Sequence, residues 1–194
     1  MTAISAYDLD TIDESVTPTS LLFMPSADVH VFLADPKASV PTTGSSEAAG
    51  YDLRAVGDYF LQPGETIIVD TGLVMRPHHG FRIDIRSRSG LAAKHNIFVL
   101  NSPGTIDRDY SGPNDVVKVI LHMLADTPYS KLPHIKDAPG PEEWGFQISR
   151  GDRIAQMLLT PTYVPHFKEV DASFFLEDGQ MMGNRDGLGS TGIK

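Results

Sequence analysis

The stretch QPGETIIVDTGLVMRPHHGFRIDI, residues 62–85, decides the fold class of this 194-residue chain. It contains three short apolar runs, at residues 66–69, 73–76 and 81–85, and the turn residues Gly and Pro stand between them. Runs of this length that are bounded by turn residues are typical of short β-strands joined by tight connections. The stretch therefore predicts antiparallel strands rather than helices.

The same pattern continues on both sides of this stretch. Further runs occur at residues 29–33, 97–100, 116–121, 146–148, 154–159 and 163–164. Gly and Pro together make up about 16% of the chain, against a usual value of about 12%. The spacing predicts an all-β sandwich or barrel, with a short helix only near residues 103–110 or 172–175.

The composition divides the chain into four parts. Residues 1–22 are polar and acidic, and we expect them to be flexible. Residues 23–180 hold the strand pattern and form the expected β-domain. Within it, residues 125–145 contain four prolines and little periodicity, which indicates a surface insertion. Residues 181–194 are rich in Gly and have no strand pattern, so we expect a C-terminal arm.

Charge and composition exclude several classes of function. The chain has no Cys, which excludes disulfides, Cys-ligated zinc and thiol nucleophiles. No apolar run reaches the roughly 18 residues of a membrane helix, and no Lys or Arg precedes Lys37, so we expect neither a membrane span nor a signal peptide. The net charge of −9 argues against a nucleic-acid partner. Six of these charges lie in residues 1–36, which leaves the remainder near balance.

Two segments carry residue types suited to phosphate chemistry. RSRSGL, residues 86–91, combines two arginines and two hydroxyls with a Gly that lets the main chain approach an anion. NSPGTIDRDYSG, residues 101–112, places Asp107 and Asp109 around Arg108, and a carboxylate near a phosphate can activate a water molecule. The alternatives are a polar edge strand for the first segment and a turn with solvated charges for the second.

Two further segments are less specific on their own. GDRIAQ, residues 151–156, is a turn that leads into an apolar strand, with Gln156 near its start. RDGLGSTG, residues 185–192, has the Gly, Ser and Thr content of a phosphate-binding loop. It lacks the GK[ST] ending and the strand-to-helix context of a Walker motif, so that motif is rejected.

Together with AAGYDLRA at residues 48–55, these segments contain five ordered motifs over residues 48–192, the second of which is RSGLA at residues 88–92. In that order and near that spacing, they resemble the trimeric dUTPase family. The resemblance implies a jelly-roll-like β-sandwich that assembles as a homotrimer with exchange of the C-terminal arms. Each active site would then draw on all three chains.

The resemblance also implies a reaction. This is the hydrolysis of dUTP to dUMP and pyrophosphate, which keeps uracil out of DNA and supplies dUMP for thymidylate synthesis. Asp107 would activate the water that attacks the α-phosphate. Mg²⁺ would chelate the triphosphate and would be held through water by Asp52.

The family pattern assigns substrate contacts to fourteen positions. It implies that the phosphates bind residues of the second and fourth motifs, the uracil and deoxyribose bind the third motif, and the arm closes over the substrate. These positions are Arg88, Ser89, Gly90, Asn101, Gly104, Thr105, Ile106, Tyr110, Gln156, Arg185, Leu188, Gly189, Ser190 and Thr191.

The chain departs from the family pattern in the fifth motif and in the loop that follows the second. Leu188 stands where most relatives have an aromatic residue over the uracil, which removes ring stacking worth roughly 1 kcal/mol. Asn96 replaces a Gly in the loop after the second motif, and Asn is the next best residue for a left-handed backbone.

Other functions remain open at this point. A relative of dCTP deaminase would share the fold, but it would need a glutamate on the strand at residues 116–124, which holds Lys118 and His122 and no acid. A dUTPase could also bind a regulatory protein through residues 125–145. The third alternative is a purely structural jelly-roll protein without enzymatic activity. The expected location is the cytoplasm of a bacterium or of a virus-infected host cell.

Overall fold

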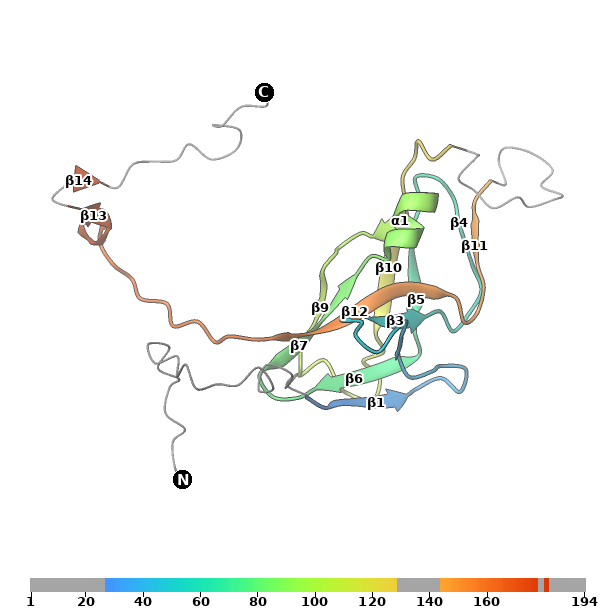
Figure 1. Ribbon diagram of the computed structural model, residues 1–194, viewed down its shortest axis with the longest axis horizontal. Coiled ribbons are helices and arrows are strands. Elements are labelled where there is room, and N and C mark those ends of the chain that lie inside the picture. The colour runs from blue at the N-terminus through green and yellow to red at the C-terminus, as the bar shows by residue number, and fades with distance from the viewer. Residues whose placement is uncertain (1–26, 129–143, 178–179, 182–194) are drawn as a thin grey trace. The chain divides into compact units, whose positions relative to one another are not determined.

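The computed structural model describes residues 27–128, 144–177 and 180–181 of the chain (Figure 1). Contacts between residues divide the chain into two compact units, Met1–Thr162 and Tyr163–Lys194. In the described residues, the first unit contains strands β1 to β12 and one helix, α1, so the all-β prediction is confirmed.

The largest sheet of the first unit has five strands in the order β2-β3-β12-β7-β9. A three-stranded sheet has the order β5-β10-β8, and two further pairs are β1-β6 and β11-β4. Every pairing among these strands is antiparallel. The strands are β1 (Val29–Leu33), β2 (Thr42–Thr43), β3 (Tyr51–Arg54), β4 (Tyr59–Leu61), β5 (Thr66–Asp70), β6 (Leu73–Pro77), β7 (Phe81–Arg86), β8 (Ile97–Val99), β9 (Gly104–Ile106), β10 (Lys118–Met123), β11 (Phe146–Ile148) and β12 (Arg153–Pro161).

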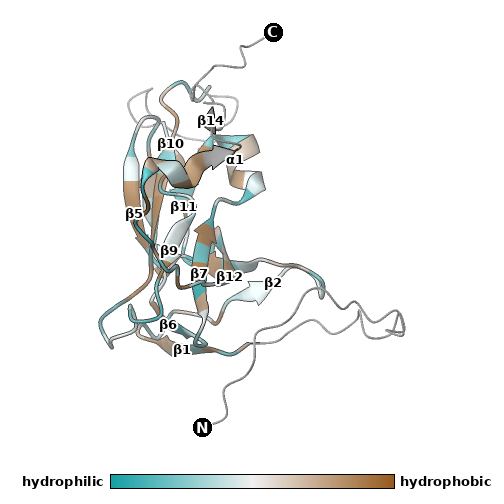
Figure 2. Cartoon of the chain, turned by 90° about the vertical axis from the view of Figure 1, so that its left-hand side faces the viewer, coloured by the Kyte–Doolittle hydropathy of each residue, from teal (hydrophilic) through white to brown (hydrophobic). Residues whose placement is uncertain are grey.

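The core forms because side chains alternate between the two faces of each strand. On β10, Val119, Leu121 and Met123 are buried, and the residues between them are more exposed. Figure 2 shows the same alternation of polar and apolar residues along β7. The buried cluster joins residues from most strands, including Leu53, Leu61, Val69, Met75, Ile83, Ile97, Ile148 and Ile154.

The helix α1 (Ser89–His95) lies outside both regions where the sequence predicted one. Asn96 ends it in the left-handed conformation, with φ 55° and ψ 29°, and its main-chain N–H bonds back to Ala92. The structure thus confirms the expectation that Asn96 takes a left-handed backbone. The helix predicted near residues 103–110 is wrong, because β9 pairs there with β7.

In the second unit, the structure describes residues 163–177 and 180–181. A single 3-10 turn, η4 (Ala172–Phe175), lies where a short helix was expected, and β13 (Leu176–Glu177) pairs with β14 (Gln180–Met181). The strand predicted at residues 163–164 is absent, and both side chains are exposed, at 86% and 79%. The prolines on either side, Pro161 and Pro165, cannot donate to a strand ladder.

Across the described residues, no helix combines the length and the apolar character that crossing a membrane requires.

Candidate active site

Three segments that are distant in the sequence meet at one end of the five-stranded sheet. Asp52 lies on β3 and is 5% exposed. Arg88 immediately precedes α1, and Arg153 is the first residue of β12. The two guanidinium groups bracket the Asp52 carboxylate, so the buried negative charge is paired on both sides.

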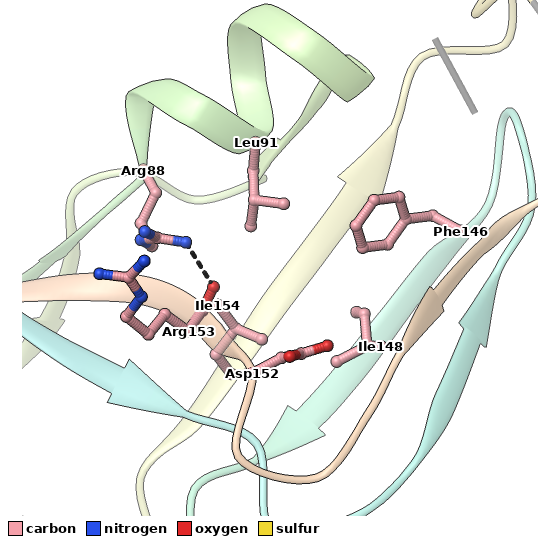
Figure 3. A pocket seen from close by; sticks show the side chains of 7 residues that line it. All are labelled: Arg88, Leu91, Phe146, Ile148, Asp152, Arg153 and Ile154. Atoms are coloured by element: carbon pink, nitrogen blue, oxygen red, sulfur yellow. Dashed lines mark hydrogen bonds between the residues drawn. The ribbon is translucent and has the colours of Figure 1, made fainter. Parts of the chain in front are cut away.

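The contacts around Asp52 differ in kind. Arg153 Nη1 donates a hydrogen bond to Asp52 Oδ2 at 3.3 Å. Arg88 Nε lies 3.2 Å from Asp52 Oδ1, but this pair is not aligned as a hydrogen bond and acts through charge. Arg88 Nη1 donates to the main-chain oxygen of Arg153 at 2.8 Å (Figure 3). Asp52 and the Arg153 carbonyl oxygen therefore hold the Arg88 guanidinium between them.

A row of polar residues crosses the sheet beside this cluster. Gln156 on β12 pairs directly with Asp52 on β3 and with Arg86 on β7. Residues that are directly opposite in an antiparallel sheet face the same side, so Asp52, Gln156 and Arg86 lie in a row on one face. A Cβ on Gly50 would lie 3.3 Å from the Gln156 side chain, so glycine leaves room for that side chain.

A pocket opens beside Arg88 and Arg153, and its volume is about 220 Å³. Apolar side chains from α1, β11 and β12 form much of its wall, and the two arginines approach it from one side (Figure 3). Its lining residues are Arg88, Leu91, Phe146, Ile148, Asp152, Arg153 and Ile154. The pocket offers both an apolar surface and cationic donors.

The segment that follows β8 has a tight connection at Ser102–Pro103, where the peptide bond is cis. Asn101 is exposed, and its side-chain amide lies over Gly104. A Cβ added to Gly104 would lie only 3.2 Å from the Asn101 amide nitrogen, so glycine leaves room for the amide. Gly104 is buried, and Ile106 is partly buried at the end of β9. The structure therefore brings Asn101 and Gly104 together.

The chain turns at Asp107 instead of continuing as a strand. The main-chain N–H of Tyr110 donates to the Asp107 carbonyl oxygen at 3.2 Å. The Tyr110 hydroxyl donates to the carbonyl oxygen of Val116 at 3.3 Å, which fixes the ring. Asp107 and Asp109 both lie in this turn, and both are exposed.

Within one chain, the Asp107 turn and the Asp52 cluster lie apart. Strands β9 and β12 flank β7 on opposite sides. Gln156 pairs with Arg86, whereas Ile106, the last residue of β9, pairs with Ile83. This register places Gln156 and Ile106 roughly 10 Å apart along the strands and about 10 Å apart across them, and Asp52 on β3 lies one strand farther away. Within the first unit of a single chain, the Asp107 turn therefore does not reach the Asp52 cluster.

The described residues contain no group of three or more His, Asp or Glu side chains arranged to hold a metal ion. Asp52 Oδ1 accepts no hydrogen bond there, so it retains acceptor capacity. The two adjacent arginines oppose direct contact with a cation, and the arrangement fits a hydrated ion held through water.

The structure describes eleven of the sixteen predicted site residues. Arg185, Leu188, Gly189, Ser190 and Thr191 lie outside the described residues. Arg153 was missed at the sequence level although the GDRIAQ motif contains it, because the motif was interpreted as a turn leading into a buried strand.

Comparison with known proteins places these features in a family. The dUTPase family model matches residues 36–127. The deoxyuridine 5'-triphosphate nucleotidohydrolase of Nautilia profundicola is 37% identical over 156 residues, which cover 80% of this chain and 92% of that protein. The enzyme of the same name from Roseobacter denitrificans is 40% identical over 164 residues, with coverage of 82% and 90%.

Solved structures give the same fold. The dUTPase of Staphylococcus bacteriophage 80alpha with dUPNHPP matches with a TM-score of 0.64 at 24% identity, covering 86% of this chain and 99% of that one. A mutant dUTPase of phage phi11 of S. aureus, described with a coordinated structural Mg(II) ion, matches with a TM-score of 0.62 at 23% identity, covering 74% and 97%. The predicted jelly-roll-like β-sandwich is confirmed, and on the identity to its bacterial relatives this chain belongs to the dUTPase family.

Proposed function

We propose that this chain hydrolyses dUTP to dUMP and pyrophosphate by attack of water on the α-phosphate. The observation that carries the proposal is the cluster of Asp52, Arg88 and Arg153 beside Gln156 in a member of the dUTPase family. This cluster supplies fixed cationic donors next to an amide donor, which suits a nucleotide triphosphate. The reaction would keep uracil out of DNA and supply dUMP for thymidylate synthesis.

In this proposal, Asp107 orients the attacking water and accepts its proton. The hydrogen bond from the Tyr110 N–H to the Asp107 carbonyl fixes the turn that carries the carboxylate. A general base needs to be held within reach of the proton that it removes. The exposed turn is compatible with access of water to Asp107.

Recognition of the deoxyuridine is assigned to residues 101–110. Main-chain groups near Asn101, Gly104, Thr105 and Ile106 bind the uracil edge, and cytosine would leave buried groups without partners. Tyr110 packs under the deoxyribose and leaves no room for a 2′-hydroxyl. The hydrogen bond from its hydroxyl to Val116 supports a fixed ring position.

The phosphates are assigned to Arg88, Ser89, Gly90 and Gln156. Arg88 is already positioned by Asp52 and by the Arg153 carbonyl, so less side-chain entropy is lost when substrate binds. We assign closure over the substrate to residues of the C-terminal arm. These are Arg185, Leu188, Gly189, Ser190 and Thr191.

A homotrimer with exchanged arms accounts for the distance between the two halves of the site. The Asp107 turn of one chain would then face the Asp52 cluster of another chain. Support comes from the register of β7, which separates Gln156 from Ile106 within a single chain. A third chain would supply the arm.

Mg²⁺ is the proposed cofactor, bound to the triphosphate and held through water by Asp52. When bound, it would neutralise part of the triphosphate charge and orient the phosphates. The acceptor capacity of Asp52 Oδ1 supports this assignment. Arg88 and Arg153 keep the carboxylate in place in the absence of the ion.

The alternative reaction, deamination of dCTP, receives no support from the structure. β10 follows the third motif and reads KVILHM, which contains no carboxylate. A regulatory protein partner that binds residues 125–145 stays a prediction, since residues 129–143 lie outside the described residues. We place the enzyme in the cytoplasm of a bacterium or a virus-infected cell, where its substrate would be found.

The test is pyrophosphate release from dUTP, dTTP, dCTP and UTP, each with and without Mg²⁺. We expect release from dUTP alone, at a rate that Mg²⁺ increases. Ammonia release from dCTP, or equal turnover of all four nucleotides, would contradict the proposal.

A further inference from the structure

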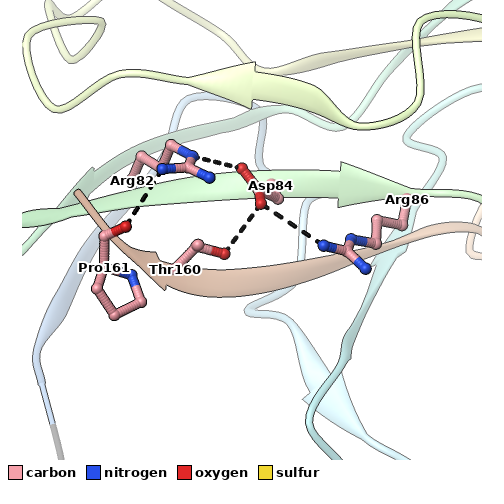
Figure 4. A network of polar contacts seen from close by, with 5 residues as sticks. All are labelled: Arg82, Asp84, Arg86, Thr160 and Pro161. Carbon is pink, nitrogen blue, oxygen red and sulfur yellow. Dashed lines mark hydrogen bonds and ion pairs between the residues drawn. The ribbon is translucent and has the colours of Figure 1, made fainter. Parts of the chain in front are cut away.

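A charged network on β7 lies next to the proposed phosphate site. It joins Asp84 to Arg82 and Arg86 on the same strand and to Thr160 on β12 (Figure 4). Residues two apart on a strand face the same side, so all three β7 side chains lie on the face that also carries Gln156.

Asp84 is the fixed centre of this network. It is 2% exposed, and Arg82 Nε and Thr160 Oγ1 donate hydrogen bonds to its two oxygens at 2.9 Å and 3.0 Å. Burial would raise the pKa of Asp84, but these hydrogen bonds and the charges of Arg82 and Arg86 lower it below its ordinary value. The carboxylate is therefore a stable anion against which an arginine can be held.

Arg86 is held much less completely than Arg82. Its Nη2 lies 3.8 Å from Asp84 Oδ2, which is an ion pair but too long for a hydrogen bond. Its side chain is 52% exposed. A guanidinium has five N–H donors in a planar fork, so this contact leaves donors available to a second anion.

The position of Arg86 indicates which anion it could meet. It pairs directly with Gln156, which in turn pairs with Asp52, and Arg88 follows it by two residues. The side chain thus stands at the β7 end of the polar row that contains Gln156, and the proposed phosphate-binding residues Arg88, Ser89 and Gly90 follow it within four positions of the chain. Arg86 belongs to the RSRSGL segment, whose arginines and hydroxyls suit phosphate binding, and the family pattern gives it no role.

We propose that Arg86 is a substrate-binding residue, whose guanidinium, held by Asp84, binds the triphosphate chain of the nucleotide beside Gln156. The inference rests on the proposed hydrolysis of dUTP. It adds a contact that acts on the phosphate chain and not on the base or sugar. Asp84 is a positioning residue in this scheme and does not touch the substrate.

The experiment measures equilibrium binding of α,β-imido-dUTP, which is not hydrolysed, and of dUMP to the full chain. The variants are Arg86→Ala and Arg86→Lys. The matched control is Arg76→Ala, which removes another exposed arginine, from β6 outside the five-stranded sheet. Steady-state KM and kcat for dUTP are measured on the same proteins.

For Arg86→Ala we expect binding of the imido analogue to weaken about tenfold to a hundredfold, as for loss of a charged hydrogen bond. Binding of dUMP should change less than about threefold, because most of the phosphate charge is absent. KM should rise more than kcat falls, Arg86→Lys should recover part of the affinity, and Arg76→Ala should match the wild type.

Two results would overturn the assignment of Arg86. One is unchanged binding of the imido analogue to Arg86→Ala, and the other is an equal loss for the analogue and for dUMP, which would indicate a structural role. If Arg86→Ala does not fold, Arg86→Gln loses the charge at similar length and carries the same test. A wild-type chain that neither binds the analogue nor releases pyrophosphate from dUTP would overturn the proposed function itself.

Discussion

Arg88 and Arg153 are joined by a hydrogen bond of 2.8 Å from the Arg88 guanidinium to the Arg153 main-chain oxygen. The two residues are 65 positions apart in the chain, and both guanidinium groups also contact Asp52. The bond ties the segment before α1 to the start of β12. It therefore sets the spacing between two motifs that are proposed to bind the same triphosphate.

Arg88→Lys should lower kcat/KM for dUTP by about tenfold or more, because an ammonium cannot reproduce the planar fork that reaches both Asp52 and the Arg153 carbonyl. The free energy of unfolding should fall by only about 1 kcal/mol, since the side chain is partly exposed. Pyrophosphate release and chemical unfolding measure the two effects. Unchanged kcat/KM would contradict the role of the fork.

Asp107→Asn should reduce kcat for dUTP by about 10²- to 10⁴-fold, because the general base is lost. Binding of α,β-imido-dUTP should remain close to that of the wild type. Asp109→Asn is the matched control, since it removes a carboxylate from the same exposed turn. Near-normal turnover by Asp107→Asn would refute the assignment of the base.

Tyr110→Ala should weaken the discrimination between dUTP and UTP, because the space that excludes the 2′-hydroxyl is opened. The ratio of kcat/KM for the two nucleotides is the measurement. Tyr110→Phe keeps the ring and removes the hydrogen bond to Val116, so it should retain most of the selectivity. An unchanged ratio in Tyr110→Ala would disprove packing of the ring against the sugar.

Asp84→Asn should make stability less dependent on pH under acidic conditions. The folded-state pKa of Asp84 lies below its ordinary value of 3.8, so its ionisation contributes stability that is present above pH 3.8. That contribution is lost as the pH falls through the folded-state pKa. The free energy of unfolding should be measured for both proteins between pH 7 and pH 3. It should be higher for the wild type than for Asp84→Asn near pH 7, and this difference should shrink only at the acid end of the range.

Gly72→Ala should destabilise the protein by about 3 kcal/mol. Gly72 has φ +64°, and an added Cβ would lie 2.8 Å from Asp35 Cβ and from Val56 Cγ1, so backbone strain and overpacking combine. Gly80→Ala is the control, because φ is +84° there but nothing lies within 4 Å of the added carbon. Urea unfolding of both variants should give the larger loss for Gly72→Ala.

Most strands could be predicted because each is a short apolar run bounded by turn residues. The helix α1 could not, because SGLAAKH spans seven residues and begins with Ser and Gly. So short a segment has little intrinsic helical stability, and tertiary contacts hold it. The strand expected at residues 163–164 failed for a related reason, since apolar side chains alone form no strand without a partner.

Only part of the candidate site could be predicted from the sequence. The ordered motifs identified Asp52, Arg88 and Gln156, although no local spacing brings these positions together. Arg153 lies in the GDRIAQ motif and Arg86 in the RSRSGL segment, yet the roles of both residues depend on strand pairing. Asp52 and Arg153 are 101 positions apart, and the hydrogen bond between them forms only because β3 pairs with β12.

The register of β7 also limits which changes of chain length the enzyme can accept. One residue inserted before Ile83 would turn Arg86 and Asp84 toward the core and would move Ile83 and Ile85 to the face that carries Gln156. Two inserted residues would restore the facing but lengthen the separation of the Asp107 turn from Gln156 by roughly 7 Å. Insertions and deletions are therefore confined to segments that pair with no strand of this sheet.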